Sequence, residues 1–151
     1  MSEERGAVER TIFIAAERET VFRFLIDPVF MAEWMGLSHT LEPAAGGIFR
    51  LEMGNGNVAV GVFTEVTPCR RVAFTWGWES ADTALAQLKP GSTLVEIELE
   101  DRDGGTLLTL RHNGLPEGLR RIHGERWAYY LDRLQQAAVA SAFNSQGSAN
   151  P

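Results

Sequence analysis

Two side chains in this sequence come closest to catalytic chemistry. His112 follows Leu108 and Leu110 at two-residue spacing, so we expect its ring to point inward from a strand, where it could hold a polar group of a ligand or transfer a proton. Glu79 adjoins Trp78, and a carboxyl group buried beside an indole keeps its proton more readily and can serve as an acid. Both residues also suit an ordinary structural role, so they are candidates only.

The three histidines do not predict a metal site. His39, His112 and His123 belong to separate predicted elements, and none has a histidine or cysteine partner at the spacing of metal ligands. His123 lies among arginines near the start of a helix, which predicts a solvated helix face. We therefore expect neither a metal nor another cofactor.

Aromatic and sulfur-containing side chains form the stronger pattern. Val72, Phe74, Trp76 and Trp78 alternate along one predicted strand and so face the same side. Such a face can line a pocket for a flat or apolar ligand, or it can simply be core. The candidate ligand-binding residues are Trp34, Phe49, Met53, Phe74, Trp76, Trp78, His112, Trp127 and Leu131.

The elements that must position these residues follow from periodicity and turn signals. Two short helices, Arg18–Ile26 and 29–35, are separated by Asp27 and Pro28 and follow a first strand at Val8–Ile14. Turns rich in glycine, asparagine and proline then separate strands at 48–53, 58–66, 72–78, 93–100 and 106–112. Residues 80–90 read as a loop or a single helical turn.

A long amphipathic helix follows the last strand. Its predicted apolar stripe combines a main row with flanking residues: Leu119, Ile122, Arg126, Tyr130, Leu134 and Ala138, with Trp127, Leu131 and Ala137 beside them. The predicted architecture is α+β: a curved antiparallel sheet that wraps around this C-terminal helix. We expect a flexible N-terminus at 1–7, one domain at 8–140 and a disordered tail at 141–151.

Composition excludes several classes of function. The 151 residues carry a formal net charge of -6, which opposes binding to nucleic acid. A single cysteine and the absence of a basic, then apolar, leader favour the cytoplasm. The longest apolar runs fall far short of the roughly 20 residues that cross a bilayer, so no membrane span is expected.

Several short motifs, taken in order, resemble a known superfamily. They are Trp34-Met35, Gly46-Gly47-Ile48-Phe49, the run from Gly61 to Pro68, Phe74-Thr75-Trp76 and the run from Leu110 to Pro116. The sequence resembles the START-related helix-grip (SRPBCC) superfamily, and within it the homologues of the activator of the heat-shock-protein-ninety ATPase. The resemblance implies a cavity between sheet and last helix, closed at one end by the two short helices, where Trp34 and Met35 could gate entry or merely pack.

The superfamily includes lipid carriers, hormone receptors and aromatic cyclases, so the resemblance fixes no single function. The leading hypothesis is binding of a small hydrophobic or aromatic ligand, without catalysis. One alternative is a protein-interaction domain with a chaperone partner, as the family label implies. Another is a cyclase- or hydrolase-like enzyme that uses His112 or Glu79. Apolar edge surface and the habit of the family also suggest a homodimer.

Overall fold

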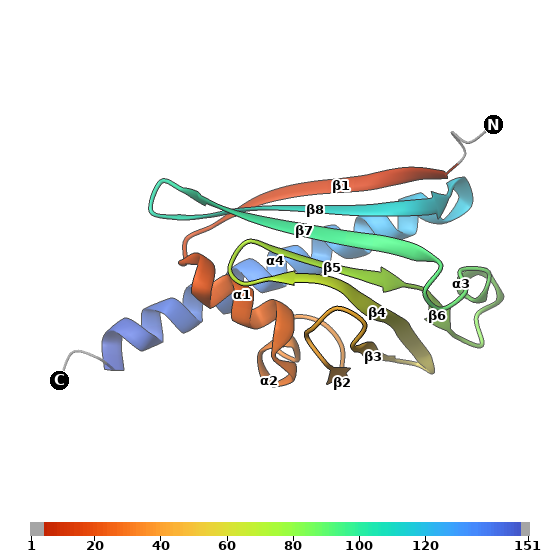
Figure 1. The fold of residues 1–151 in the computed structure, drawn as a ribbon, viewed down its shortest axis with the longest axis horizontal. Helices are drawn as coiled ribbons and strands as arrows, with labels where there is room; N and C mark the ends of the chain where they lie inside the picture. The colour runs from red at the N-terminus through yellow and green to blue at the C-terminus, as the bar shows by residue number, and fades with distance from the viewer. Residues whose placement is uncertain (1–4, 149–151) are drawn as a thin grey trace.

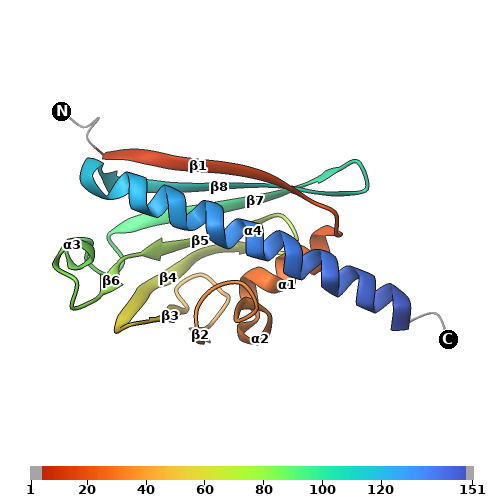
Figure 2. The ribbon, with the colours of Figure 1, turned by 180° about the vertical axis from the view of Figure 1, so that it is seen from behind.

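The computed structural model describes residues 5–148 and shows one antiparallel sheet with a long helix across one face (Figures 1 and 2). The sheet has eight strands, and short helices follow the first of them. The predicted α+β helix-grip architecture is therefore confirmed. No helix within residues 5–148 combines the length and apolar character needed to cross a membrane.

The strands follow the predicted runs, with β2 added and the predicted strand 72–78 divided at Gly77 into β5 and β6. Their bounds are β1 Arg5–Ile14, β2 Ser38–Leu41, β3 Ile48–Gly54, β4 Asn57–Thr67, β5 Arg71–Trp76, β6 Trp78–Glu79, β7 Thr93–Arg102 and β8 Gly105–Pro116. Seven of them lie in the order β1-β8-β7-β5-β4-β3-β2, and β6 pairs with β4. Neighbours in sequence mostly pair as hairpins, whereas β1 lies at the edge opposite β2.

The chain crosses from one edge of the sheet to the other through α1, Arg18–Ile26, and α2, Pro28–Met31. Asp27 ends the first helix and caps the second, because its Oδ1 accepts a hydrogen bond of 2.8 Å from the Val29 N–H. Proline at the first helical position fits this junction. The second helix is shorter than the predicted 29–35, because the chain turns after Met31 and places Trp34 against the core.

Helix α4, Glu117–Ser148, crosses the concave face of the sheet diagonally (Figure 2). Its buried face consists of Leu119, His123, Trp127, Leu131, Leu134 and Ala138. The predicted stripe was therefore rotated: Ile122 is 42% exposed and Arg126 is exposed, while His123 is only 4% exposed. The spacing of apolar residues is compatible with either the predicted or the observed buried face. Because the large Trp127 ring is buried, His123, four positions earlier, lies on the same buried side.

Both ends of the domain extend beyond the predicted limits. β1 begins at Arg5 instead of Val8, because it pairs with the last residues of β8. α4 continues through 141–148, where a tail was expected, and Ala142 still packs on the core. The remaining predicted tail lies outside the described residues.

Candidate functional site

A cavity of about 280 Å³ lies between the first half of α4 and one end of the sheet. Its walls come from the β3–β4 hairpin, from β5 and β6, from α4, and from α3, Thr83–Ala86. The wall residues are Met35, Met53, Gly54, Asn55, Asn57, Trp76, Trp78, Asp82, Ala84, Leu85, Gly118, Leu119, Ile122, His123, Arg126, Trp127 and Tyr130. Most are aromatic or aliphatic, which is typical of a site for an apolar molecule.

Three tryptophan rings dominate the wall. Trp76 lies between the other two, with 5.3 Å between ring centroids to both Trp78 and Trp127. Gly77 makes this arrangement possible at the break between β5 and β6. A Cβ atom at this position would lie 1.7 Å from the carbonyl oxygen of Lys89, so only glycine fits. Trp76 and Trp78 thus reach the same cavity from two separate strands.

Trp78 is fixed by His123. Its indole Nε1–H donates to Nε2 of His123 across 3.0 Å, and the other ring nitrogen, Nδ1, lies 2.8 Å from the carbonyl oxygen of Leu119. Because an indole nitrogen can only donate, His123 must accept at Nε2 and donate from Nδ1. Burial lowers the pKa of His123, and the positive charge of Arg126 lowers it further. The ring is therefore neutral near pH 7.

Trp127 is fixed in the same way by His112. The Trp127 Nε1–H donates to Nδ1 of His112 at 3.0 Å, so Nε2 carries the proton and donates to the hydroxyl of Thr93 at 2.8 Å. That hydroxyl donates in turn to the carbonyl oxygen of Trp76 at 2.7 Å. Burial lowers the pKa of His112 to about 3, with a smaller contribution from His123, so this ring is also neutral.

Trp76 differs from its two neighbours. It is 3% exposed, and its Nε1–H has no hydrogen-bond partner among the described residues. A buried donor without an acceptor costs roughly 1–3 kcal/mol, so it is an exception that needs an explanation. The nearest rings of the core do not supply an acceptor, since both ring nitrogens of His112 are already engaged.

The structure brings four of the predicted ligand-binding residues together in the wall: Met53, Trp76, Trp78 and Trp127. The other five lie in the core and outside the wall: Trp34, Phe49, Phe74, His112 and Leu131. Trp34 is 1% exposed and donates its Nε1–H to the carbonyl oxygen of Phe24, so it packs and does not gate. Phe49 and Phe74 stack on one another, with ring centroids 3.9 Å apart, in the aromatic core that includes Trp76.

The acid–base candidates do not converge. His112 is fully buried with both nitrogens hydrogen-bonded. The expectation that Glu79 is buried beside Trp78 is wrong, because Glu79 is exposed and pairs with Arg50 at 3.2 Å. Neither side chain lines the cavity, so the described residues do not form the pair that acid–base catalysis would require.

Several wall residues are not among the predicted ligand-binding residues. The predicted solvated position of His123 is wrong, because His123 stands four residues from both Leu119 and Trp127, a spacing that places all three on one side of a helix. Residues of α3 join the wall because Asp82 caps this short helix through hydrogen bonds from the N–H groups of Ala84 and Leu85. That cap could have been found in the sequence.

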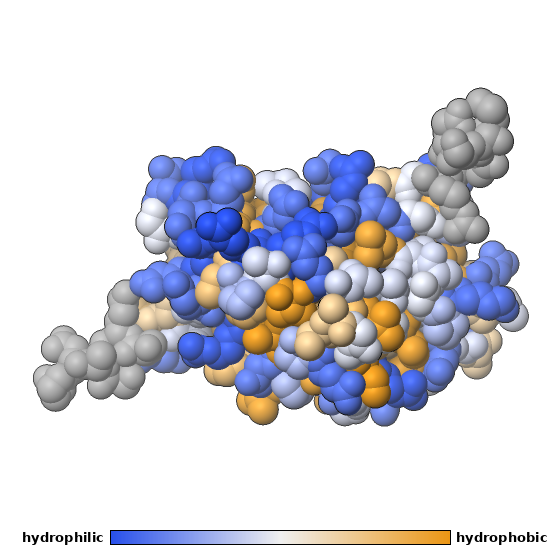
Figure 3. Space-filling model, in the orientation of Figure 1, coloured by the Kyte–Doolittle hydropathy of each residue, from blue (hydrophilic) through white to orange (hydrophobic). Residues whose placement is uncertain are grey.

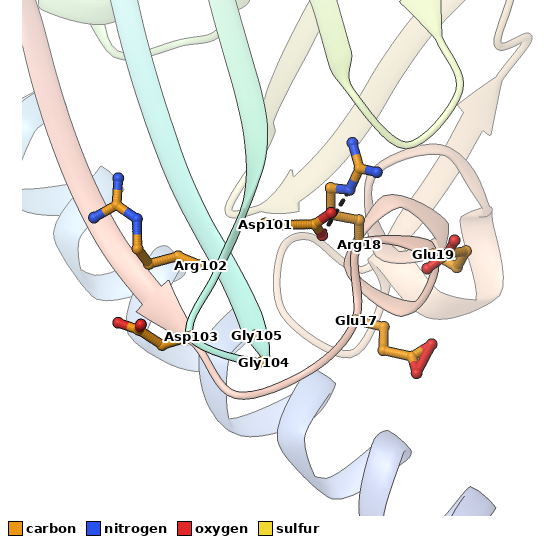
Figure 4. Close-up of a pocket in the computed structure, with 8 residues that line it drawn as sticks. All are labelled: Glu17, Arg18, Glu19, Asp101, Arg102, Asp103, Gly104 and Gly105. Atoms are coloured by element: carbon orange, nitrogen blue, oxygen red, sulfur yellow. Dashed lines mark ion pairs between the residues drawn. The ribbon is translucent and has the colours of Figure 1, made fainter.

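A second hollow lies at the far end of the sheet, beneath the β7–β8 hairpin, with a volume of about 350 Å³ (Figure 4). Its wall consists of charged side chains and two glycines: Glu17, Arg18, Glu19, Asp101, Arg102, Asp103, Gly104 and Gly105. Arg18 and Asp101 form an ion pair of 2.9 Å within it (Figure 4). It lacks the apolar wall that makes the tryptophan cavity the better candidate.

Comparison with known proteins places the fold in a family. The model of the family described as "Activator of Hsp90 ATPase homolog 1-like protein" matches residues 15–138. An AHSA1-like protein from Rhizobium etli, solved in solution, is 38% identical with a TM-score of 0.69, and the match covers 89% of this chain and 82% of that one. No protein with curated annotation matches the chain significantly.

More distant structures share the fold. A protein from Mesorhizobium loti is 23% identical with a TM-score of 0.75, over 87% of this chain and 95% of that one. The Aha1 dimer from Colwellia psychrerythraea is 18% identical with a TM-score of 0.73, over the same shares of the two chains. The family match spans most of the domain, from the end of β1 to the last buried turn of α4. The chain therefore belongs to the family of activator of Hsp90 ATPase homolog 1-like proteins, within the SRPBCC helix-grip superfamily.

Proposed function

We propose that this protein binds a small hydrophobic or aromatic molecule in the cavity between α4 and the sheet. The observation that carries the proposal is the arrangement of Trp76, Trp78 and Trp127 around a space of about 280 Å³. Trp76 and Trp127 belong to the core, yet the space they border with Trp78 is not filled by side chains, although a core gains most by filling such space. The three rings provide flat, rigid apolar surfaces for a ligand.

The size of the cavity limits the ligand. Pockets for drug-sized molecules usually measure roughly 300–1,000 Å³, so this one suits a compound of about one or two fused rings. Met35 and Met53 lie in the wall, and their unbranched side chains adapt to ligands of different outline. Both neutral histidines act as supports, since each holds a tryptophan in place and keeps no free nitrogen for chemistry.

Gly118 provides a direct steric test. It lies in the cavity wall in the first turn of α4, and a Cβ atom built there meets no atom within 4 Å. The Gly118→Phe variant therefore adds a ring at the cavity without a backbone clash. Ala128→Phe is the matched control, because Ala128 is exposed on the same helix and outside the wall.

The experiment measures thermal stabilisation by a panel of one- and two-ring aromatic compounds and fatty acids, with native mass spectrometry of the protein as purified. We expect parent and Ala128→Phe to be stabilised by the same compounds, and Gly118→Phe to lose this response. The proposal fails if no compound stabilises the parent and no small molecule co-purifies, or if the blocked variant responds as the parent does.

The alternative of a chaperone partner has weaker support. The family description names an activator of a chaperone ATPase, and apolar residues gather over the middle of the outer sheet face among polar ones (Figure 3). On β3 and β4, Ile48 and Val62 pair with each other and are 43% and 41% exposed. A patch of two half-exposed side chains is small compared with the apolar patches of known interaction sites. A homodimer, as in the Colwellia relative, also stays a prediction.

A further inference from the structure

The two charged side chains of the cavity wall have opposite signs and differ in their contacts. Asp82 and Arg126 are the two side chains in the wall with a full charge near pH 7, because the histidine there is neutral. Asp82 already uses Oδ1 to cap α3 through the N–H groups of Ala84 and Leu85. Arg126 is exposed and forms no ion pair or hydrogen bond with any of the described residues. The wall thus holds a guanidinium group with no counter-ion.

Other hydrogen-bonding groups in or near the wall differ in whether they already have a partner. The buried Nε1–H of Trp76 has no acceptor. Asn57 already accepts a hydrogen bond from the Ser80 hydroxyl at its Oδ1, so its amide hydrogens remain as donors. The acceptor nitrogens of His112 and His123 are taken by Trp127 and Trp78. The guanidinium group of Arg126 and the amide of Asn57 therefore offer donors to a ligand that carries acceptor atoms.

The first turn of α4 adds positive electrostatic potential at the cavity. Gly118 and Leu119 belong to the wall, so the positive end of the helix dipole lies beside the cavity. The exposed Glu117 of the same turn is not a wall residue. The whole chain carries a net charge of -6, so a preference for an anion has to come from these local groups and not from the general field.

We propose that the ligand is an organic carboxylate with an apolar or aromatic body, which places its acid group beside Arg126 and its body among Trp76, Trp78 and Trp127. This inference rests on the proposed function and specifies the class of its ligand. A neutral hydrocarbon would form no hydrogen bond with the guanidinium group, whereas a carboxylate supplies acceptor oxygens for it. Arg126 would repel a cation placed at the same position.

The test compares two ligands of the same shape and different charge. 2-Naphthoate and 2-naphthamide have the same ring system, and their affinities for the parent protein can be measured by calorimetry at pH 7.5. Arg126→Gln removes the positive charge, and because Arg126 is exposed it should not disturb folding. Arg121→Gln is the control, since Arg121 carries the same charge on the same helix but pairs with Glu125 and lies outside the wall.

We expect the parent and Arg121→Gln to bind naphthoate about tenfold more tightly than naphthamide, a modest preference because the arginine is exposed to solvent. Arg126→Gln should bind both compounds alike. Equal affinities in the parent, or an unchanged preference in Arg126→Gln, would overturn the carboxylate assignment and leave apolar binding intact. If neither compound binds the parent, and a panel of other acids and amides also fails, the proposed function itself is contradicted.

Discussion

The Nε1–H of Trp127 donates to Nδ1 of His112 across 3.0 Å and so joins α4 to β8 inside the core. His112 sits opposite both Val8 and Val95, so this single ring connects the helix to the middle of three strands. The bond fixes one wall of the tryptophan cavity, and its strength determines how rigid that wall is.

A double-mutant cycle measures this bond. His112→Leu leaves the buried indole N–H of Trp127 without an acceptor, and Trp127→Phe leaves Nδ1 of His112 without a donor. We expect each single change to lower the free energy of unfolding by about 2–4 kcal/mol. The double variant should recover about 1–2 kcal/mol relative to the sum, as measured by urea unfolding. Strict additivity would show that the bond contributes nothing.

The buried histidines predict acid sensitivity. The pKa of His112 is lowered from 6.5 to about 3, and that of His123 is lowered as well. As pH falls below about 6.5, these histidines bind protons in the unfolded chain but not in the folded protein. The free energy of unfolding therefore decreases toward pH 3. Each such histidine contributes a slope of up to about 1.4 kcal/mol per pH unit.

Urea unfolding at pH 5 and pH 6 checks this slope. His112→Asn keeps an acceptor for Trp127 and cannot titrate in this range, so its stability should depend less on pH than that of the parent. His39→Asn is the control, because His39 is half-buried on β2 and away from the pair. An identical slope in the parent and in His112→Asn would show that His112 titrates normally in the folded protein.

The hydrogen bond from Trp78 occupies the Nε2 atom of His123. Trp78→Phe keeps an aromatic ring in the wall but removes the donor that occupies Nε2 of His123. That nitrogen can then accept a proton and bond to water in the cavity, so we expect the pKa of His123 to rise toward its ordinary value. A pH titration of the histidine signals by NMR measures this rise. An unchanged pKa of His123 would mean that the hydrogen bond from Trp78 does not contribute to lowering it.

Substitution by alanine should affect stability very differently at two glycines near the cavity. A Cβ atom at Gly77 would lie 1.7 Å from a backbone oxygen of Lys89, so Gly77→Ala must displace the chain between Trp76 and Trp78. We expect a loss of more than about 2 kcal/mol in thermal or urea unfolding. Gly118→Ala has free space and should stay within about 0.5 kcal/mol of the parent. Equal effects would show that the local packing differs from this structure.

The fold was predictable because each element carries a local signal. Alternation along β5 and the Asp27-Pro28 break between the helices depend only on neighbouring residues, and the structure confirms the architecture they predict. The α3 cap is equally local and was overlooked. The buried face of α4 was harder to predict from spacing, because Ile122 and Tyr130 also fit an apolar stripe that is rotated around the helix from the observed one.

The candidate site was only partly predictable, because its polar contacts join distant parts of the chain. Trp78 and His123 are 45 residues apart, and nothing local indicates that they meet. The sequence also does not show which inward aromatics border empty space: Phe74 and Trp76 alternate on one strand, yet only Trp76 belongs to the cavity wall. Whether a wall position faces space depends on how the helix, the hairpins and α3 pack together.

We expect a ligand to enter the cavity beside Trp76, and the indole N–H signals of the four tryptophans are the most direct test of this entry. Three of these residues line the cavity, and Trp34 is an internal control because its N–H is bonded to Phe24 in the core. In a titration with 2-naphthoate followed by proton–nitrogen NMR, we predict a large shift for Trp76, smaller shifts for Trp78 and Trp127, and none for Trp34. If all four signals stay in place, or if Trp34 shifts as much as Trp76, the cavity is not the binding site.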